Sequence, residues 1–241
     1  MAIDLLLEEL VTANRILANE NVVDGFGHVT VRHPDRADRF LMSRARAPQC
    51  IEVGDLMEFS LDGTPTDAQG RKPYLERFIH GAIYEARPEI KSVVHNHSPS
   101  VIPFGITQKK LRPLMHMCAT IGHEVPVWDI KDNFGDTDLL VADMAMGRDL
   151  AKTLGNRPTA LMRGHGCVVA AETLRKAVYV SIYMELNANL QMKAMAMGDV
   201  KFLSPGEVDA VTARTSGFGI DRAWEYWCRR AGREAQGLEI D

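Results

Sequence analysis

The sequence predicts an α/β protein in which a layered sheet is flanked by helices. Short stretches rich in β-branched and aromatic residues alternate along the chain with longer stretches of helical periodicity. Hydrophobic residues make up 46% of the 241 residues and charged residues 25%, which is ample material for a large core. The sequence contains no Pro/Ser/Gly linker, low-complexity stretch or internal repeat. We therefore expect residues 1–241 to form a single domain.

The first half of the chain predicts two helices that enclose three short strands. The expected elements are a helix over about 5–19, strands at 29–31, 40–43 and 57–61, and a helix over 75–87. Gly25 and Gly27 end the first helical pattern, Asp62-Gly63 supplies a turn after the third strand, and Pro88 lies just beyond the second helix.

The second half adds further strands and a long helix. The expected elements are a strand that ends at His95 and His97, a strand at 124–128, a helix over 139–154, a strand, turn and strand over 159–170, and a helix over about 174–197. Pro126 cannot donate to a ladder, so its strand belongs at an edge of the sheet. The long helix is expected to place Tyr179, Ile182, Tyr183, Leu186 and Leu190 on one side.

Charge and hydropathy indicate which partners to expect. The net charge of −4 gives no electrostatic footprint for nucleic acid or an anionic membrane surface. No apolar run approaches the length needed to span a bilayer. The first residues are acidic where a signal peptide would need a basic and then an apolar region, so we expect a cytoplasmic protein.

The cysteines are scattered and form no C-x-x-C pair. They are expected to be reduced and mostly buried, as in a reducing compartment: Cys50, Cys118, Cys167 and Cys228. Because Cys167 lies two residues from His165, a ligand or redox role for it stays open.

Three histidines carry the strongest chemical signal in the chain. His95 and His97 follow a β-branched run, and side chains at i and i+2 of a strand lie on one face. His165 stands between Gly164 and Gly166, in a turn where the backbone and a ligand can approach closely. Three imidazoles can bind a divalent cation and leave coordination positions for water or substrate. The pattern predicts a catalytic metal site.

Other titratable residues are more ambiguous. His33, His116 and His123 are interpreted as ordinary polar side chains. Glu76 lies on the expected helix before the histidine strand, where it is either an exposed carboxylate or a group that faces the metal. In the second case it would be a ligand, a base, or an acid with a raised pKa.

An ordered set of motifs resembles the class II aldolase/adducin family. The resemblance runs from about Leu5 to Gly206 and rests on Gly27-His28-Val29-Thr30-Val31-Arg32, Glu76-Arg77-Phe78-Ile79-His80, Ile83-Tyr84-Glu85-Ala86-Arg87-Pro88, Val94-His95-Asn96-His97-Ser98-Pro99 and Arg163-Gly164-His165-Gly166. It implies a three-layer α/β/α sandwich with a central, mostly antiparallel sheet, and commonly a homotetramer with sites near the subunit interfaces. It also implies a divalent metal held by His95, His97 and His165, with Glu76 as the acid/base residue.

The chain departs from the sugar-phosphate aldolases of that family where they bind phosphate. Their Asn in a G-N-x-S stretch, their Thr-Gly pair and their Ser-Ser pair correspond here to His28, Ser43-Arg44 and Tyr74-Leu75. An arginine fork matches a carboxylate, and aromatic side chains suit a planar ring. Alternatively, the site still takes a phosphate and Arg44 binds it.

A further pattern is similar to the family branch that decarboxylates hydroxylated pyridine dicarboxylates and dihydroxyphthalates. It comprises Tyr74 to His80, Arg163 to Gly166, and Arg222 to Trp227. Trp224 and Trp227 would either contact the substrate or anchor a C-terminal extension, residues 207–241, to the core or to a neighbouring subunit.

These observations predict a metal-dependent carbon–carbon lyase that decarboxylates a hydroxylated aromatic or heteroaromatic (di)carboxylate. The divalent ion would disperse the charge left on carbon as an enolate, with zinc or manganese favoured and cobalt or iron feasible. Glu76 is the first candidate for the acid that protonates this carbon, and His28 or His80 would assist or replace it. The candidates for binding the small anionic substrate are Arg44, Arg77, Tyr74 and Arg163.

Two other functions remain open at this stage. One is an aldolase that cleaves a hydroxy-keto acid or sugar phosphate, or a related dehydratase or epimerase. The other is a catalytically silent scaffold of the adducin kind, although this chain retains the three histidines and the glutamate.

Overall fold

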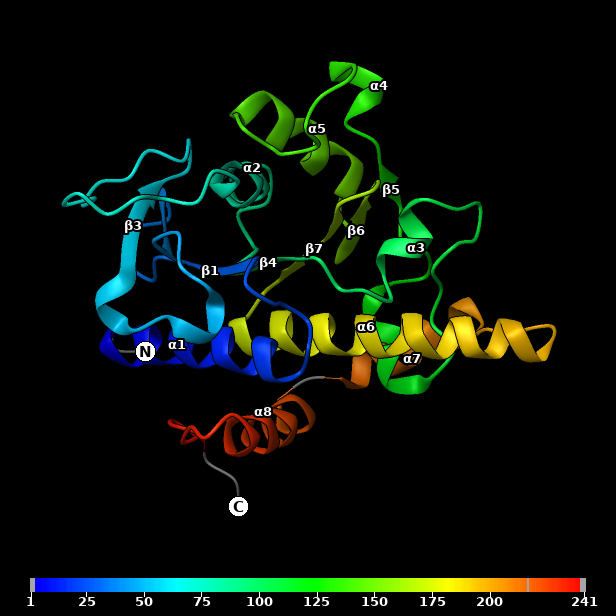
Figure 1. Cartoon of the computed structure of the whole chain (residues 1–241). Helices are drawn as coiled ribbons and strands as arrows, with labels where there is room; N and C mark the ends of the chain where they lie inside the picture. The colour runs from blue at the N-terminus through cyan, green and yellow to red at the C-terminus, as the bar shows by residue number, and fades with distance from the viewer. Residues whose placement is uncertain (1–2, 216, 239–241) are drawn as a thin grey trace.

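A mixed, mostly antiparallel sheet forms the centre of the protein (Figure 1). The computed structural model describes residues 3–215 and 217–238. Seven strands pair in the order β3-β2-β1-β4-β7-β6-β5, and only β5 and β6 run parallel. The strands are β1 (His28–Arg32), β2 (Arg39–Ser43), β3 (Leu56–Ser60), β4 (Ser92–Asn96), β5 (Val127–Trp128), β6 (Thr159–Met162) and β7 (Gly166–Ala171). The fold class predicted from the sequence is confirmed.

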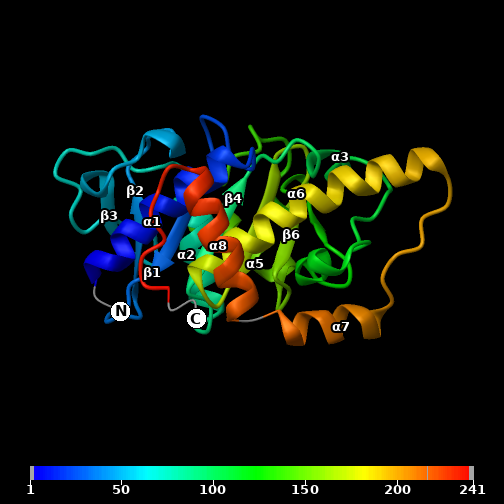
Figure 2. The same ribbon diagram turned by 90° about the horizontal axis from the view of Figure 1, so that it is seen from below.

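Helices cover both faces of this sheet. On one face lie α1 (Ile3–Asn19) and α6 (Leu174–Met197), and α8 (Phe218–Arg230) packs against the outer side of these two helices, as Figures 1 and 2 show. On the other face α2 (Arg77–Ala86) packs against α5 (Met144–Leu154). The remaining helices are α3 (Ile102–Gly105), α4 (Lys131–Phe134) and α7 (Pro205–Arg214), with the 3-10 turns η1 (Pro48–Cys50), η2 (Val53–Asp55) and η3 (His116–Ile121).

The sheet divides the hydrophobic core into two layers, because successive side chains of a strand point to opposite faces. On β4, Val94 packs among the side chains of α1 and α6, whereas Val93 packs with those of α2 and α5. The central strands β1, β4 and β7 are buried along their whole length. Such strands present two apolar faces, so any polar side chain on them needs a partner inside the protein.

The register of the central strands gathers polar groups at one edge of the sheet. His28 at the start of β1 lies directly opposite His95 near the end of β4. Asn96 of β4 in turn lies opposite Cys167 near the start of β7. The start of β1, the end of β4 and the start of β7 therefore meet at the same edge.

Two predicted helices begin later than expected. The helix expected from Leu75 begins at Arg77, and Leu75 itself is 49% exposed. The helix expected from residue 139 begins at Met144, after Asp143 caps it by accepting a hydrogen bond from Met146 N–H. Residues 139–143 instead form a loop that returns to α2.

The strand expected at 124–128 is confirmed as an edge strand but is shorter, because only Val127–Trp128 pair as β5. The expected apolar side of α6 is wrong in its second half. Leu186 is 39% exposed, while Asn187 and Gln191 are buried. Their amides bind backbone groups of residues 110–114, and burial of a polar side chain costs little when it is paired in this way.

Trp224 and Trp227 of α8 are buried against α6, where Trp227 packs near the rings of Tyr179 and Tyr183. They anchor α8 to the core of the same chain. Of the four cysteines, Cys50 is exposed and the other three are buried, all as free thiols. Among the helices of the described residues, none combines the length and the apolar character that a bilayer crossing requires.

We predict that Gly81→Ala lowers the free energy of unfolding by at least about 2 kcal/mol, because overpacked sites must distort. Gly81 lies on α2, and a Cβ at this position would stand 2.1 Å from the carbonyl oxygen of Leu61. Urea denaturation measures the change. Gly206→Ala in α7 is the matched control, since a Cβ there meets nothing within 4 Å. Equal stability of Gly81→Ala and wild type would contradict this packing.

Candidate metal centre

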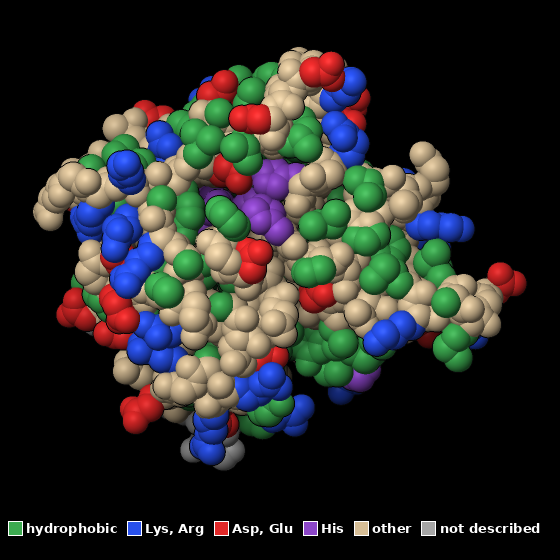
Figure 3. Space-filling model, in the orientation of Figure 1, with side chains coloured by type: hydrophobic (Ala, Val, Ile, Leu, Met, Phe, Trp, Pro, Cys, Tyr) green, Lys and Arg blue, Asp and Glu red, His purple; other side chains and the backbone are tan. Residues whose placement is uncertain are grey.

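Four side chains converge at the edge of the sheet where β1, β4 and β7 meet. His95 lies on β4, His97 follows its last residue, His165 lies in the turn between β6 and β7, and Glu76 caps the start of α2. One potential ligand atom from each lies within 4.8 Å of all the others. Figure 3 shows histidine side chains at the bottom of a hollow, with hydrophobic side chains around it. The predicted cluster of three histidines is present, and Glu76 faces it.

The three imidazoles are arranged as ligands of one ion would be. Each pair of ring centroids among His95, His97 and His165 is 4.9 Å apart. The Nε2 atoms of His95 and His97 are 3.1 Å apart. Two imidazole nitrogens that each lie about 2.1 Å from one metal ion are separated by roughly 3.0–3.4 Å.

The protonation of these rings also suits a metal. His95 Nδ1 lies 3.0 Å from the carbonyl oxygen of Cys167, which can only accept, so Nδ1 carries the proton and Nε2 presents a lone pair. Burial, together with the neighbouring imidazoles of His95 and His165, lowers the pKa of His97 to about 4. Its ring is therefore neutral at pH 7, which is the form that binds metals. A divalent ion fits this donor set.

The glycines beside His165 have different roles from the one expected. Gly164 has φ +65°, a conformation that side chains rarely adopt, and it turns the chain so that His165 projects toward the cluster. A Cβ on Gly166 would stand 2.1 Å from the carbonyl oxygen of Asn96, so this glycine lets β7 pass against β4. The glycines therefore shape the backbone of the turn.

Glu76 is held in place by both of its carboxylate oxygens. Oε1 accepts a hydrogen bond from the backbone N–H of Val141 at 3.0 Å. Oε2 lies 3.5 Å from Nε2 of both His95 and His165. Burial alone would raise the pKa of Glu76, but the imidazoles of His95 and His165 outweigh it and hold the pKa well below its ordinary value.

His28 and His80 lie beside the metal cluster and bond to each other. His28 Nδ1 is 2.7 Å from His80 Nε2, and the ring of His28 is 5.1 Å from that of His95. Burial lowers the pKa of His28 well below its ordinary value and lowers the pKa of His80 to about 3. Both rings are therefore neutral at pH 7. His28 adjoins the cluster directly, whereas His80 adjoins His28.

The candidate substrate-binding residues differ in their surroundings. The ring of Tyr74 packs 4.7 Å from that of His28 and so forms an aromatic wall beside the cluster. Arg44 donates Nε–H to Asp55, and Arg163 donates Nε–H to Asp129, each at 2.5 Å. Arg77 donates to the backbone carbonyls of Gly63 and Tyr74, so its side chain holds the segment before α2.

Arg77 is therefore fixed through Nε and one terminal nitrogen, and substrate binding by its other terminal nitrogen stays a prediction. For Arg44 and Arg163 only Nε has a side-chain partner among the described residues, which leaves their terminal nitrogens for a ligand.

Cys167 is not a metal ligand. Its thiol donates to the Asn96 side chain at 3.1 Å, on the face of the sheet opposite to His95, and burial raises its pKa to about 12. The histidines interpreted as ordinary polar residues lie outside the cluster. His33 contacts Arg36 and Glu58, and His123 pairs with Asp209 at 2.8 Å.

Sequence patterns missed three contributors to the site. Val141 supplies its N–H to Glu76 from the loop that was expected to be helical. Thr30 and Tyr84 extend the His28–His80 pair into the core, where Thr30 Oγ1 lies 2.8 Å from both His80 Nδ1 and Tyr84 OH. A threonine on a buried strand and a tyrosine on a helix resemble ordinary core residues, so only their contacts reveal them.

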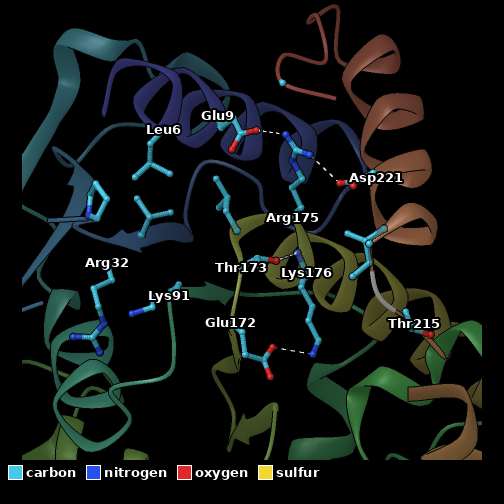
Figure 4. A pocket seen from close by; sticks show the side chains of 16 residues that line it. Leu6, Glu9, Arg32, Lys91, Glu172, Thr173, Arg175, Lys176, Thr215 and Asp221 are labelled. Atoms are coloured by element: carbon cyan, nitrogen blue, oxygen red, sulfur yellow. Dashed lines mark hydrogen bonds and ion pairs between the residues drawn. The ribbon is translucent and has the colours of Figure 1, made fainter. Parts of the chain in front are cut away.

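A separate cavity of about 740 Å³ lies at the opposite ends of the central strands. Figure 4 shows Arg175 of α6 between Glu9 and Asp221, with Glu172 paired to Lys176. Its described lining includes none of the predicted catalytic or metal residues. Its acidic side chains form ion pairs with Arg175 and Lys176. These ion pairs link neighbouring helices, and the described lining shows no group of side chains arranged for catalysis or metal binding.

Comparison with known proteins identifies a family and several relatives of this chain. The sequence matches the family described as Class II Aldolase and Adducin N-terminal domain over residues 8–192. It is 35% identical over 247 residues to Decarboxylase tropJ of Talaromyces stipitatus, with 92% of each chain covered. It is 27% identical to 3,4-dihydroxyphthalate decarboxylase of Arthrobacter keyseri, with 91% of each chain covered. The structure of L-fuculose 1-phosphate aldolase from Glaciozyma antarctica is similar with a TM-score of 0.75 and 25% identity, covering 95% of this chain and 90% of that chain.

We predict that the purified protein contains about one divalent ion per chain and that EDTA lowers its melting temperature, because an ion that binds the folded state stabilises it. His97→Ala should weaken metal binding at least about a hundredfold, since it removes a ligand rather than an outer partner. Metal content by mass spectrometry and competition with a chromogenic chelator measure both effects.

His123→Ala serves as the control for this variant, because His123 is an exposed histidine that pairs only with Asp209. A wild-type protein that carries no metal and melts at the same temperature with or without EDTA would favour the scaffold alternative.

Proposed function

The chain belongs to the class II aldolase and adducin family, and from this premise we propose that it is a metal-dependent carbon–carbon lyase that decarboxylates a hydroxylated aromatic or heteroaromatic carboxylate. The observation that carries the proposal is that potential ligand atoms of His95, His97, His165 and Glu76 all lie within 4.8 Å of one another. A scaffold of the adducin kind has no need for such a set. The relatives named as decarboxylases support the choice of reaction.

Decarboxylation leaves the electron pair of the broken C–C bond on carbon, and this charge must be stabilised until a proton arrives. A divalent ion, when bound by the three histidines, would supply Lewis-acid stabilisation of that charge. Glu76 lies beside the same three rings, with Oε1 fixed by Val141 and Oε2 turned toward the cluster. The imidazoles beside it keep Glu76 ionised before the substrate binds, so we propose that Glu76 takes up a proton from the substrate hydroxyl or from water and delivers it to the carbon that loses CO2.

The walls of the site suit an aromatic anion. Tyr74 offers a ring face next to His28, and a planar substrate can stack on such a face. Arg163 stands two residues before His165, although its side chain lines a pocket formed with Asp129 and residues 104–111 that includes none of the metal-cluster residues. Arg44 would offer its terminal nitrogens to a carboxylate from the end of β2, where Asp55 fixes its orientation.

An aldolase that cleaves a hydroxy-keto acid or sugar phosphate is the alternative. The similarity to the L-fuculose 1-phosphate aldolase structure favours it. Both reactions use the same cluster, but aldol cleavage releases an aldehyde and no CO2.

We also propose a homotetramer with sites near the subunit interfaces. Leu75, which precedes Glu76 in the sequence, is 49% exposed, and Phe26, which precedes Gly27, is 69% exposed. Apolar surface of this kind is typical of protein–protein contacts. Light scattering coupled to gel filtration tests the tetramer, and a monomer at all concentrations would contradict it.

The deciding experiment is a CO2-release assay on dihydroxyphthalates and hydroxylated pyridine dicarboxylates, with metal-loaded and EDTA-treated protein in parallel. We expect CO2 from the metal-loaded protein alone. Aldehyde release from hydroxy-keto acids or sugar phosphates without CO2 would establish the alternative.

We predict that Glu76→Gln lowers the decarboxylation rate at least about a hundredfold, since positioned acid–base groups typically contribute 10²–10⁴-fold. Steady-state kinetics measure the rate, and mass spectrometry verifies that the variant retains its metal.

The control is Glu85→Gln on α2, because Glu85 is solvent-exposed and pairs with Arg148. If Glu76→Gln turned over substrate at nearly the normal rate with its metal in place, the assignment of Glu76 would be wrong.

A further inference from the structure

A chain of buried hydrogen-bonding groups runs from the core to the metal cluster. Tyr84 OH lies 2.8 Å from Thr30 Oγ1, which lies 2.8 Å from His80 Nδ1, and His80 Nε2 lies 2.7 Å from His28 Nδ1. Tyr84 is 1% exposed, Thr30 and His80 are 0% exposed, and His28 is 3% exposed. No solvent reaches these bonds, so each proton in the chain needs an acceptor within it.

The direction of the first two bonds follows from the acceptors available. Within the described part of the chain, Thr30 Oγ1 is the side-chain partner of the Tyr84 hydroxyl and can accept its proton, so Tyr84 donates to Thr30. The Thr30 hydroxyl then has its own proton to place. His80 Nδ1 accepts it at 2.8 Å, in preference to the carbonyl oxygen of Val93 at 3.4 Å.

The remaining protons follow from the chemistry of a neutral imidazole, which carries one N–H and one lone pair. His80 accepts at Nδ1, so it carries its proton on Nε2 and donates it to His28 Nδ1. His28 accepts at Nδ1, so its proton lies on Nε2. The Nε2 atom of His28 has no hydrogen-bond partner among the described residues, and it is not completely buried from solvent.

We propose that Tyr84, Thr30 and His80 hold His28 in the Nε2–H tautomer, so that His28 donates a hydrogen bond to an anionic oxygen of the substrate at the metal cluster. This inference rests on the proposed function for its substrate class, a hydroxylated aromatic carboxylate. His28 is then a substrate-binding residue, and the other three are positioning residues that act through it.

The location of His28 suits this role. Its ring lies between Tyr74, at 4.7 Å, and the metal ligand His95, at 5.1 Å. An aromatic substrate that stacked on Tyr74 with its oxygens toward the cluster would bring an oxygen within reach of this edge. A neutral imidazole N–H fixed before the substrate arrives is a preorganised donor for a negative oxygen. It also leaves Glu76 as the proton donor.

The tautomers can be measured without any substrate. Long-range ¹H–¹⁵N correlation spectra of zinc-loaded protein distinguish protonated from unprotonated ring nitrogens, and His28→Asn and His80→Gln variants assign the signals. We expect both His28 and His80 to be protonated at Nε2. A His28 that carries its proton on Nδ1, or a His80 that donates from Nδ1 to Val93, would overturn the proposal.

Thr30→Val removes the central hydroxyl and keeps the shape of a strand residue. We expect it to abolish the single His28 tautomer and to raise the Kd of salicylate, used as a probe with an ortho hydroxyl and carboxylate, by about tenfold. Thr30→Ser should restore both. Thr159→Val is the matched control, because Thr159 is equally buried on β6 and its hydroxyl bonds to Ile121 instead.

Metal content should be unchanged in all these variants. This result would distinguish a defect in the Tyr84–Thr30–His80–His28 hydrogen-bond chain from the loss of a metal ligand. An unchanged His28 tautomer in Thr30→Val, or an unchanged Kd for salicylate in a protein that binds it, would refute the proposed role of this hydrogen-bond chain. A wild type that binds no salicylate and releases no CO2 would count against the proposed function. The tautomers of His28 and His80 in the spectra would then test the hydrogen-bond chain independently of any substrate.

Discussion

The antiparallel register of β1, β4 and β7 is the constraint on which the site depends. It brings the start of β1, the end of β4 and the start of β7 to one edge of the sheet, with His28 opposite His95. A slip of one residue would turn His95 to the other face of the sheet, among the apolar side chains of α1 and α6. Val93 and Val94, which precede His95 on β4, prevent such a slip, since each would leave its own core layer. The packing of the core therefore also fixes the geometry of the metal ligands.

Burial of polar groups is the second physical theme of the molecule. His80, Thr30 and Tyr84 lie inside one layer of the core, where an unpaired polar group would be costly, and they satisfy each other in a single chain. Glu76 likewise accepts a hydrogen bond from the Val141 backbone N–H on one oxygen and faces the imidazoles of His95 and His165 with the other. Such fully paired networks fix side chains in one orientation, and an active site needs that rigidity.

The sequence was a good guide to elements whose signals are local. The long helix was predicted with its observed bounds, and the turn at His165 was recognised from its two glycines. The prediction was wrong where a contact with a residue far along the chain outweighed the local helical spacing. Residues 139–143 have helical spacing, but Val141 instead gives its N–H to Glu76. Arg77 shows a related limit, because its Nε and one terminal nitrogen donate to backbone carbonyls that no spacing rule could identify.

The sequence by itself determined the ligand types, the face shared by His95 and His97, and the layered α/β class, because strand alternation and helical periodicity are properties of neighbouring residues. Only the tertiary structure decided that Glu76 faces the cluster, that the Cys167 thiol lies on the opposite face, and that His28 is joined through His80 to Tyr84. These facts depend on contacts between residues that are not neighbours along the chain, and local sequence patterns cannot specify such contacts. Packing and the pairing of buried polar groups settle them together.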